Sequence, residues 1–183
     1  MKRLRPTDEN RFLEETLGHA DLLYALARRL VPRGEDAADL VQETYLRAYA
    51  AWGRRRPDDV AAWLATICLN AGRDDLRRRG RRPTVLLGTN TPEQRAETDT
   101  AEEAIGRATA ATVHAALQSL PDAQRVAITL MDLCGFAAAE VARITGSPRG
   151  TVLARVHRGR KLLASLLDAQ TFSTDETADD PRS

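Results

Sequence analysis

The hydrophobic residues in the first half of the chain recur about every 3.6 positions, a spacing that predicts amphipathic helices. The periodic segments span residues 10–30, 35–52 and 57–79, and Pro57 and Asp58 are well placed to begin the third. The apolar positions that set the first two periods are Phe12, Leu13, Leu17, Leu22, Leu23, Leu26, Leu30, Ala37, Val41, Tyr45, Ala48 and Trp52. We expect these segments to pack together as one compact helical domain.

The helical periodicity stops after residue 83 and returns further along the chain. Residues 84–105 collect Thr, Pro and acidic side chains, the composition of a flexible linker. The helical pattern resumes over residues 106–167, whereas residues 168–183 form an acidic tail poor in large apolar residues. The chain is therefore predicted to be all-α, with two small helical domains at 8–83 and 106–167.

Composition agrees with a helical protein and excludes several classes. The 183 residues are 43% hydrophobic but only 4% aromatic, which favours close-packed helices over a sheet. No apolar run approaches the roughly 18 residues of a membrane span, and the N-terminus lacks a signal-peptide pattern, so we expect a cytoplasmic protein without membrane contact. Cys68 and Cys134 fit no metal-ligand or redox spacing, and we expect free thiols and no metal site.

Charge is unevenly distributed although the formal net charge is only +1. Residues 73–83 are heavily basic, and residues 147–167 contain five Arg or Lys and no Asp or Glu. Such blocks are often no more than solvated faces. Their position beside helical motifs instead favours contact with nucleic acid.

The second basic segment follows a helix-turn-helix spacing. Ala142, Gly146 and Val152 supply a small residue at a helix crossing, a glycine for a turn with positive φ, and an apolar contact between the helices. Ser147 is expected to cap the second helix, with Pro148 at its first position. The alternative is a helical hairpin with an exposed basic face, but the missing acids favour DNA, because phosphates repel carboxylates.

Six residues of this second helix are candidate DNA contacts. Arg149 and Thr151 lie in the first turn, where a helix in the major groove meets base edges. The basic side chains further along can reach phosphates or bases; they are Arg155, Arg158, Arg160 and Lys161. Charge alone does not decide which of them read bases.

Four stretches of the chain together resemble a known family. They are, in order, DLVQETYLRAYAAW, AWLATICLNAGRDDLRR, LQSLPDAQRVAITLMDLCGFAAAEVARITG and SPRGTVLARVHRGRKLL. They are similar to conserved regions two and four of bacterial RNA polymerase sigma factors of the extracytoplasmic-function type. The resemblance implies two helical domains without enzymatic activity or cofactor, which bind core RNA polymerase through its beta and beta-prime subunits, and promoter DNA. An anti-sigma factor is a further candidate partner, and no small-molecule substrate is implied.

The resemblance assigns a docking surface for core polymerase to Asp39, Gln42 and Glu43. Asp39 and Glu43 belong, with Asp36 and Arg47, to a polar stripe opposite the apolar one. The alternative is a solvated face with ion pairs along the helix, each worth a few tenths of a kcal/mol.

The resemblance also places Asn70 in a pocket for a flipped-out base of the minus 10 promoter element. A side-chain amide both donates and accepts hydrogen bonds, which suits a base edge. The alternative is a helix C-cap, since Gly72 follows closely. The basic residues after it would hold the DNA backbone; they are Arg73, Arg77, Arg78, Arg79, Arg81 and Arg82.

The sequence departs from the family pattern at two places. Ala137 and Ala138 replace the usual Ser cap and aromatic residue before the scaffold helix, and a lost cap costs about 1 kcal/mol. Leu153 and Ala154 replace the usual basic residue and Ser after the GTV motif. Two expected contacts to the minus 35 element are therefore missing, which leaves the sequence of that element open.

Two other functional classes, a transcriptional regulator and an enzyme acting on nucleic acid, predict different sequence features. A transcriptional regulator that does not replace the sigma subunit predicts a ligand-binding or phosphoacceptor domain, whereas the first domain here carries a basic island and the DLVQE stripe. An enzyme acting on nucleic acid predicts clustered carboxylates or metal ligands. His19, His114 and His157 are isolated, and no triad or phosphate loop is present, so no catalytic residue is predicted.

Overall fold

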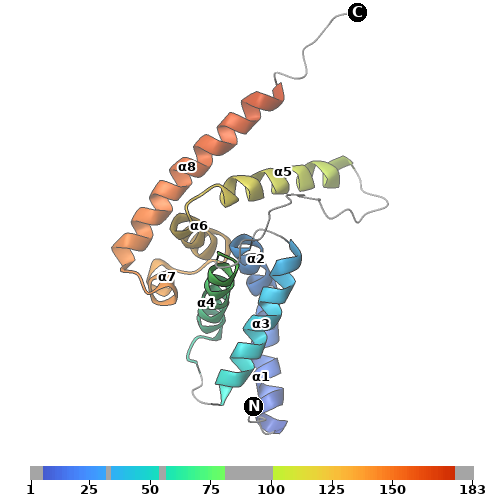
Figure 1. The fold of residues 1–183 in the computed structure, drawn as a ribbon, viewed down its shortest axis with the longest axis vertical. Helices are drawn as coiled ribbons and strands as arrows, with labels where there is room; N and C mark the ends of the chain where they lie inside the picture. Colours follow the sequence, from blue (N-terminus) through green and yellow to red (C-terminus); the bar gives the residue numbers. More distant parts are fainter. Residues whose placement is uncertain (1–5, 32–33, 54–56, 81–100, 176–183) are drawn as a thin grey trace, which may run out of the picture.

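The computed structural model describes residues 6–31, 34–53, 57–80 and 101–175, and within these ranges every regular element is helical (Figure 1). The first set of helices comprises α1 (Pro6–Thr16), the 3-10 turn η1 (Leu17–His19), α2 (Ala20–Leu30), α3 (Gly34–Trp52) and α4 (Val60–Gly80). The second comprises α5 (Ala101–Gln118), α6 (Asp122–Ile128), the π-helical turn η2 (Thr129–Leu133), α7 (Ala138–Thr145) and α8 (Arg149–Asp175). The predicted all-α class is confirmed.

The second set of helices extends beyond its predicted limits at both ends. Helix α5 begins at Ala101, inside the segment predicted as linker, and α8 continues through Asp175, past the predicted end at residue 167. The other predicted linker residues, 84–100, and tail residues, 176–183, lie outside the described residues. Few large apolar residues mark either extension, so the hydrophobic pattern gave no signal there.

Asp59 begins α4. Its Oδ1 accepts a hydrogen bond of 2.9 Å from the backbone amide of Ala62, the arrangement of an N-cap residue and the third residue of the helix. The predicted start at Pro57 and Asp58 was therefore one or two residues early. Trp63, in the first turn, packs against Trp52 with ring centroids 5.7 Å apart and lies partly buried at the edge of the core.

Helix α4 passes through Gly72 without a break. Gly72 is buried, and a Cβ there would lie 3.4 Å from Leu40 Cδ2 and 3.5 Å from Leu30 Cδ1. A Cβ at these distances would make ordinary van der Waals contact with both leucines, so alanine would also fit there. The glycine costs the helix about 1 kcal/mol relative to alanine.

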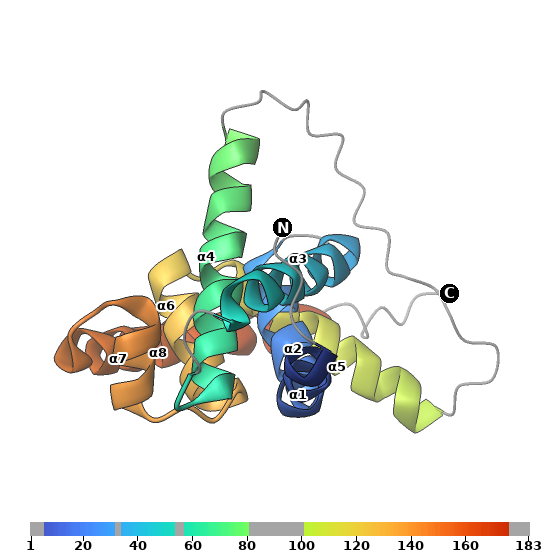
Figure 2. The same ribbon diagram turned by 90° about the horizontal axis from the view of Figure 1, so that it is seen from below.

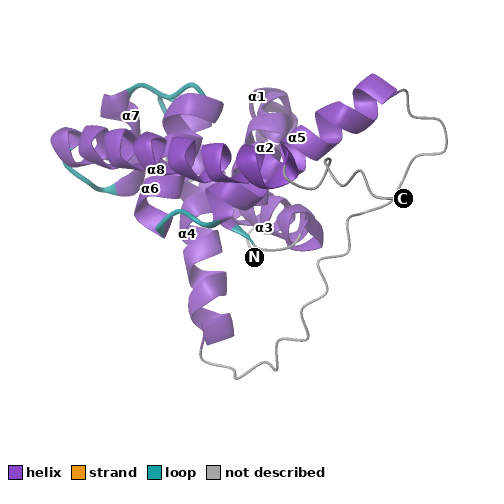
Figure 3. Ribbon diagram, turned by 90° about the horizontal axis from the view of Figure 1, so that it is seen from above, coloured by secondary structure: helices purple, strands orange, loops and turns teal. Residues whose placement is uncertain are grey.

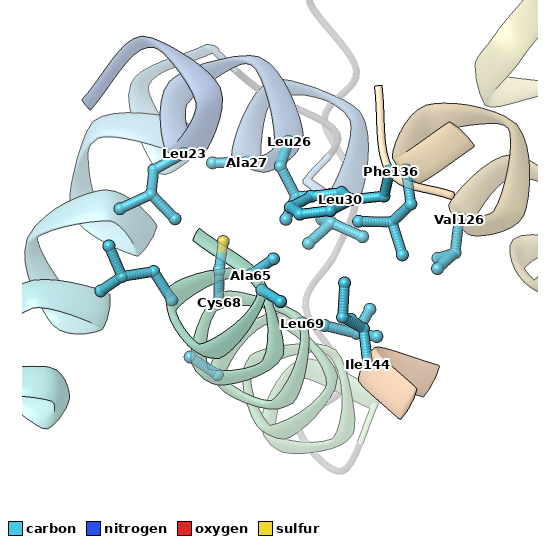
Figure 4. Close-up of a cluster of buried hydrophobic side chains, with 14 of the residues drawn as sticks. Leu23, Leu26, Ala27, Leu30, Ala65, Cys68, Leu69, Val126, Phe136 and Ile144 are labelled. Atoms are coloured by element: carbon cyan, nitrogen blue, oxygen red, sulfur yellow. The ribbon is translucent and has the colours of Figure 1, made fainter. Parts of the chain in front are cut away.

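The two sets of helices share one hydrophobic core (Figure 4). Leu30 of α2 and Leu69 of α4 lie in the same buried cluster as Phe136 and Ile144. Phe136 lies just before α7, and Ile144 lies in its last turn. Gln118 Nε2 of α5 also donates a 3.3 Å hydrogen bond to the backbone oxygen of Arg29. The two predicted domains are therefore packed against each other in this structure.

Candidate docking surface and nucleic-acid interface

Helices α7 and α8 form the predicted helix-turn-helix. Gly146 ends α7 with φ of +66°, and its amide donates to the carbonyl of Ala142. The amide of Ser147 donates to the same carbonyl at 3.1 Å. Val152 of α8 is buried. Gly146 therefore has the positive φ that the sequence predicted, and Val152 is buried as predicted.

The caps of these two helices differ from the prediction. The carbonyl of Pro148 accepts the amide of Val152 at 3.1 Å, so Pro148, not Ser147, occupies the N-cap position of α8. At the start of α7, Glu140 Oε2 accepts the amide of Ala137 at 2.7 Å. This bond is half of a capping box and offsets part of the loss expected from the missing Ser.

One face of α8 is buried against α6. Val156 is 3% exposed, and Gly159 lies so close to α6 that a Cβ there would stand 2.6 Å from Ile128 Cδ1. The sequence analysis did not single out Gly159, because glycine in a helical pattern carries no apolar signal. The close approach fixes which face of α8 is turned away from the protein.

The outer face of α8 carries the predicted DNA-contact residues, in two groups. Arg149, Arg158 and Lys161 are exposed, and their side chains have no hydrogen bond or ion pair with another described residue. The other two basic residues have partners within the protein. Arg155 NH1 donates to Ser147 Oγ at 2.8 Å, and Arg160 Nε donates to Asp132 Oδ2 at 2.9 Å.

Because of these partners, the predicted minus 35 contact residues differ in how freely their side chains can reach DNA. Arg160 engages Asp132 through both Nε and NH2 and remains 60% exposed, so it can still approach a phosphate beside the carboxylate. Arg155 must give up Ser147 before it can turn to DNA. Thr151 is half-buried at the first turn. The DNA-binding roles of all six residues stay predictions.

The C-terminal half of α4 projects from the rest of the protein, as Figures 2 and 3 show. Asn70, Arg73 and Arg77 are exposed there at intervals of three and four residues, so they share one face. Arg78 is exposed beside them, and Arg79 belongs to the same helix. Arg81 and Arg82 lie outside the described residues.

The C-cap interpretation of Asn70 is wrong. The helix continues for ten residues beyond it, to Gly80, so Asn70 lies in the helix interior with its side chain at the surface. Gly72, which suggested a helix end, lies inside α4 next to Leu30 and Leu40. The base-pocket interpretation stays a prediction, and the helix C-cap that was its alternative is excluded.

The predicted docking stripe lies on the exposed side of α3. Asp39 and Gln42 are exposed, and their side chains make no hydrogen bond to another described residue. Glu43 is 43% exposed and accepts a 2.7 Å bond from Arg47 Nε. Leu46, which the sequence analysis did not select, is 50% exposed one turn further on.

Arg47 joins this stripe to α4. Its NH1 donates to Asp74 Oδ2 at 2.9 Å while its Nε holds Glu43. The hydrogen bond from Arg47 is the main cause that lowers the pKa of Asp74, so that carboxylate stays ionised among the arginines. The ion pairs of the alternative interpretation are thus present at Glu43, whereas Asp39 and Gln42 remain available to a partner.

The described residues offer no other evident chemistry. They contain no group of three or more His, Cys, Asp or Glu that could hold a metal ion, and none of their helices is long and apolar enough to cross a membrane. Burial raises the pKa of the Cys68 thiol to about 12 and that of Cys134 to about 11, so both stay protonated near neutral pH. Both are free thiols, as predicted.

Comparison with known proteins matches each set of helices to a conserved region of one protein family. Sigma-70 region 2 matches residues 17–82, and sigma-70 region 4 matches residues 110–163. The ECF RNA polymerase sigma factor SigM of Mycobacterium tuberculosis is 37% identical over 150 residues, which cover 81% of this chain and 73% of SigM. The chain belongs to the ECF sigma factors. The RNA polymerase sigma-H factor of Pseudomonas aeruginosa is 31% identical, over 91% of each chain.

Not every relative of this ECF sigma factor is matched over its full length. SigE of Mycolicibacterium smegmatis is 35% identical over 87% of this chain, but the match spans only 63% of SigE. The sigma factor RpoE of Bartonella quintana, solved with the anti-sigma factor NepR, has a similar fold, with a TM-score of 0.71, 29% identity and coverage of 86% of this chain and 97% of that one. CnrH, solved with the cytosolic domain of CnrY, gives a TM-score of 0.67, 28% identity and coverage of 88% and 90%.

Within the ECF sigma factor, the matched regions correspond to the two sets of helices. Region 2 ends at residue 82 and includes α2, α3 and α4, with the docking stripe and Asn70. Region 4 includes α6, α7 and the part of α8 that bears the basic face. The family match covers both surfaces that the sequence selected.

Proposed function

We propose that this chain binds core RNA polymerase and directs it to promoters whose minus 10 and minus 35 elements it reads. Asp39, Gln42 and Glu43 dock on the polymerase, Asn70 and the arginines of α4 hold the melted minus 10 element, and the outer face of α8 lies in the major groove of the minus 35 element. The observation that carries the proposal is the exposed face of Asn70, Arg73 and Arg77 on the projecting half of α4. The same chain also contains a helix-turn-helix, formed by α7 and α8.

The proposed role needs no catalytic residue in this chain, because polymerase supplies the chemistry, and it places the protein in the cytoplasm with the polymerase. The two similar structures hold NepR, an anti-sigma factor, and the cytosolic domain of CnrY. We include an inhibitory protein of this kind among the proposed partners. A regulator that leaves the resident sigma subunit in place accounts for α8 but not for the exposed carboxylates of α3.

Promoter binding requires the two sets of helices to separate. Positions minus 10 and minus 35 are 25 base pairs apart, or about 85 Å along B-form DNA. A compact chain of this length has a radius of gyration of about 16 Å. Since α4 packs directly against α7 in the structure, the two DNA-binding faces cannot reach both elements until that contact opens.

The direct test is initiation by reconstituted polymerase. The purified chain is added to core polymerase, and the 5′ ends of transcripts made from genomic DNA are sequenced. We expect new start sites that share two upstream elements about 25 base pairs apart. If the chain neither binds core polymerase nor produces any start site, it is not a sigma subunit.

Substitution of Asn70 separates base reading from helix stability. Asn70→Ala should leave the melting temperature unchanged or slightly higher, because alanine is the better helix former at an exposed interior position. Promoter opening should lose about 1 to 3 kcal/mol, the range of a good bidentate base contact. Permanganate footprinting of open complexes measures the loss.

The same footprints show whether the Asn70 contact is specific. On promoters that differ at one minus 10 base, the loss should be large for the preferred base and small for the other three. An equal loss with all four bases would contradict base reading and would leave Asn70 as a backbone contact.

A further inference from the structure

Leu153 is an exposed hydrophobic residue in the middle of the basic face of α8. Its side chain is 43% exposed in the second turn of the helix. Arg149 and His157, four residues before and after it, are also exposed and lie on the same side of the helix. A single exposed leucine is ordinary at a protein surface, so its surroundings must decide whether it has a role.

The surroundings of Leu153 form a shallow groove of about 470 Å³. Its apolar lining comes from Leu153, Val156 and Met131, the last from η2. Its other lining residues are His157, Arg160 and Lys161, all exposed. The groove therefore combines an apolar floor with a basic edge, which matches a ligand that has both apolar groups and negative charge.

Duplex DNA fits this combination better than an apolar protein segment does. The groove begins at Leu153, in the second turn of the second helix of a helix-turn-helix, close to the N-terminal residues that meet base edges. In the major groove, the only apolar group on a base edge is the C5 methyl of thymine. The phosphates on either side of such a thymine would face the basic residues. Ala154, next to Leu153, is small enough to let the helix approach closely.

We propose that Leu153 contacts the C5 methyl group of a thymine in the minus 35 element and makes this chain select thymine at that base pair. The proposal rests on the proposed promoter-binding function of α8. It explains how a helix that lacks the basic residue and Ser expected after the GTV motif retains a sequence preference: an apolar contact replaces polar ones.

The test removes the methyl group from the DNA and the side chain from the protein. Reconstituted holoenzyme containing the full chain first selects duplexes from a library with randomised minus 35 and minus 10 elements. In a selected duplex, each minus 35 thymine is then replaced singly by deoxyuridine, which lacks only the methyl group. With the parent chain, one such replacement should weaken binding about threefold to fivefold, as for one buried methyl group.

Two leucine variants of α8 show whether Leu153 makes the contact with the thymine methyl group. Leu153→Ala should bind the thymine duplex about threefold to fivefold more weakly than the parent does, and it should not respond to deoxyuridine at the sensitive position. Leu162→Ala is the matched control, because Leu162 is 38% exposed on the same helix but does not line the groove. It should respond to deoxyuridine as the parent does.

Several outcomes would overturn the proposal. They are the absence of any deoxyuridine-sensitive thymine, a Leu153→Ala holoenzyme that keeps the full deoxyuridine response, and a Leu153→Ala chain that no longer binds core polymerase. The last would show that the groove binds protein. In all three cases the parent holoenzyme still initiates, so the proposed function stands. A parent chain that supports no initiation on any duplex refutes both.

Discussion

Reversing Asp39 and Glu43 to Lys will weaken binding to core RNA polymerase by at least about 100-fold, because each loss of a charged partner at an interface costs about 2 to 5 kcal/mol. Both side chains are at the surface of α3, so the substitutions bury no charge within the protein. The helical content should therefore be retained. Binding of labelled chain to purified core polymerase, followed by fluorescence anisotropy, measures the change.

The control for the docking prediction is the reversal of Glu14 and Asp21 to Lys. These residues are exposed on α1 and α2, and their reversal changes the net charge by the same amount. The control should bind core polymerase nearly as the parent does. A Glu43→Gln variant also removes the acceptor charge for Arg47 without introducing repulsion, and it should give a smaller loss. Equal binding by the Asp39 and Glu43 double variant and the parent would eliminate α3 as the docking surface.

Replacing Ile144 by Asp is expected to separate the two sets of helices. Ile144 is 4% exposed and lines a pocket with Ala62 and Trp63 of α4, so the new carboxylate would lie against apolar side chains of that helix. Burial of a charge costs far more than loss of one apolar contact, and opening the contact returns the charge to water. Small-angle X-ray scattering should show the radius of gyration rise from about 16 Å to more than 20 Å.

A second variant shows whether the expansion comes from separation of the two sets of helices or from local unfolding of α7. Ala62→Glu places a charge on the opposite side of the same contact, on α4. Both variants should expand the chain while their far-ultraviolet circular dichroism stays that of the parent. Arg143→Ala is the matched surface control, because Arg143 lies beside Ile144, is 66% exposed and only approaches Asp59 at 4.0 Å. If neither buried charge expands the chain, the shared core does not hold the two sets of helices together.

Local features of this chain were predictable because they depend on neighbouring residues. The 3.6-residue periods gave the helices of both sets, and the spacing of Ala142, Gly146 and Val152 gave the turn between α7 and α8. The polar stripe that contains Asp39 and Glu43 followed from helical geometry, whereas its role in docking, together with Gln42, came from the family resemblance. The direction in which each of these side chains points is set within one or two turns of its own helix.

Other features depend on residues far apart in the sequence. Asn70 had both a cap and a pocket interpretation until the course of α4 through Gly72 to Gly80, beside Leu30 and Leu40, excluded the cap. The partners of Arg155 and Arg160 likewise became visible only once Ser147 and Asp132 were placed beside them. Glycine and polar residues leave no mark in a hydrophobic pattern, so their roles emerge from contacts.

Residue spacing in this ECF sigma factor was enough to predict most of its helical segments, its helix-turn-helix and the basic character of the end of α4 and of the outer face of α8. The joining of both sets of helices through one core, around Leu30, Leu69, Phe136 and Ile144, emerged from the three-dimensional packing. An apolar residue on an amphipathic helix must be buried, but its sequence does not say against which helix. That choice depends on shape complementarity among distant side chains, and here it brings α7 onto α4 and closes the arrangement that promoter binding must open.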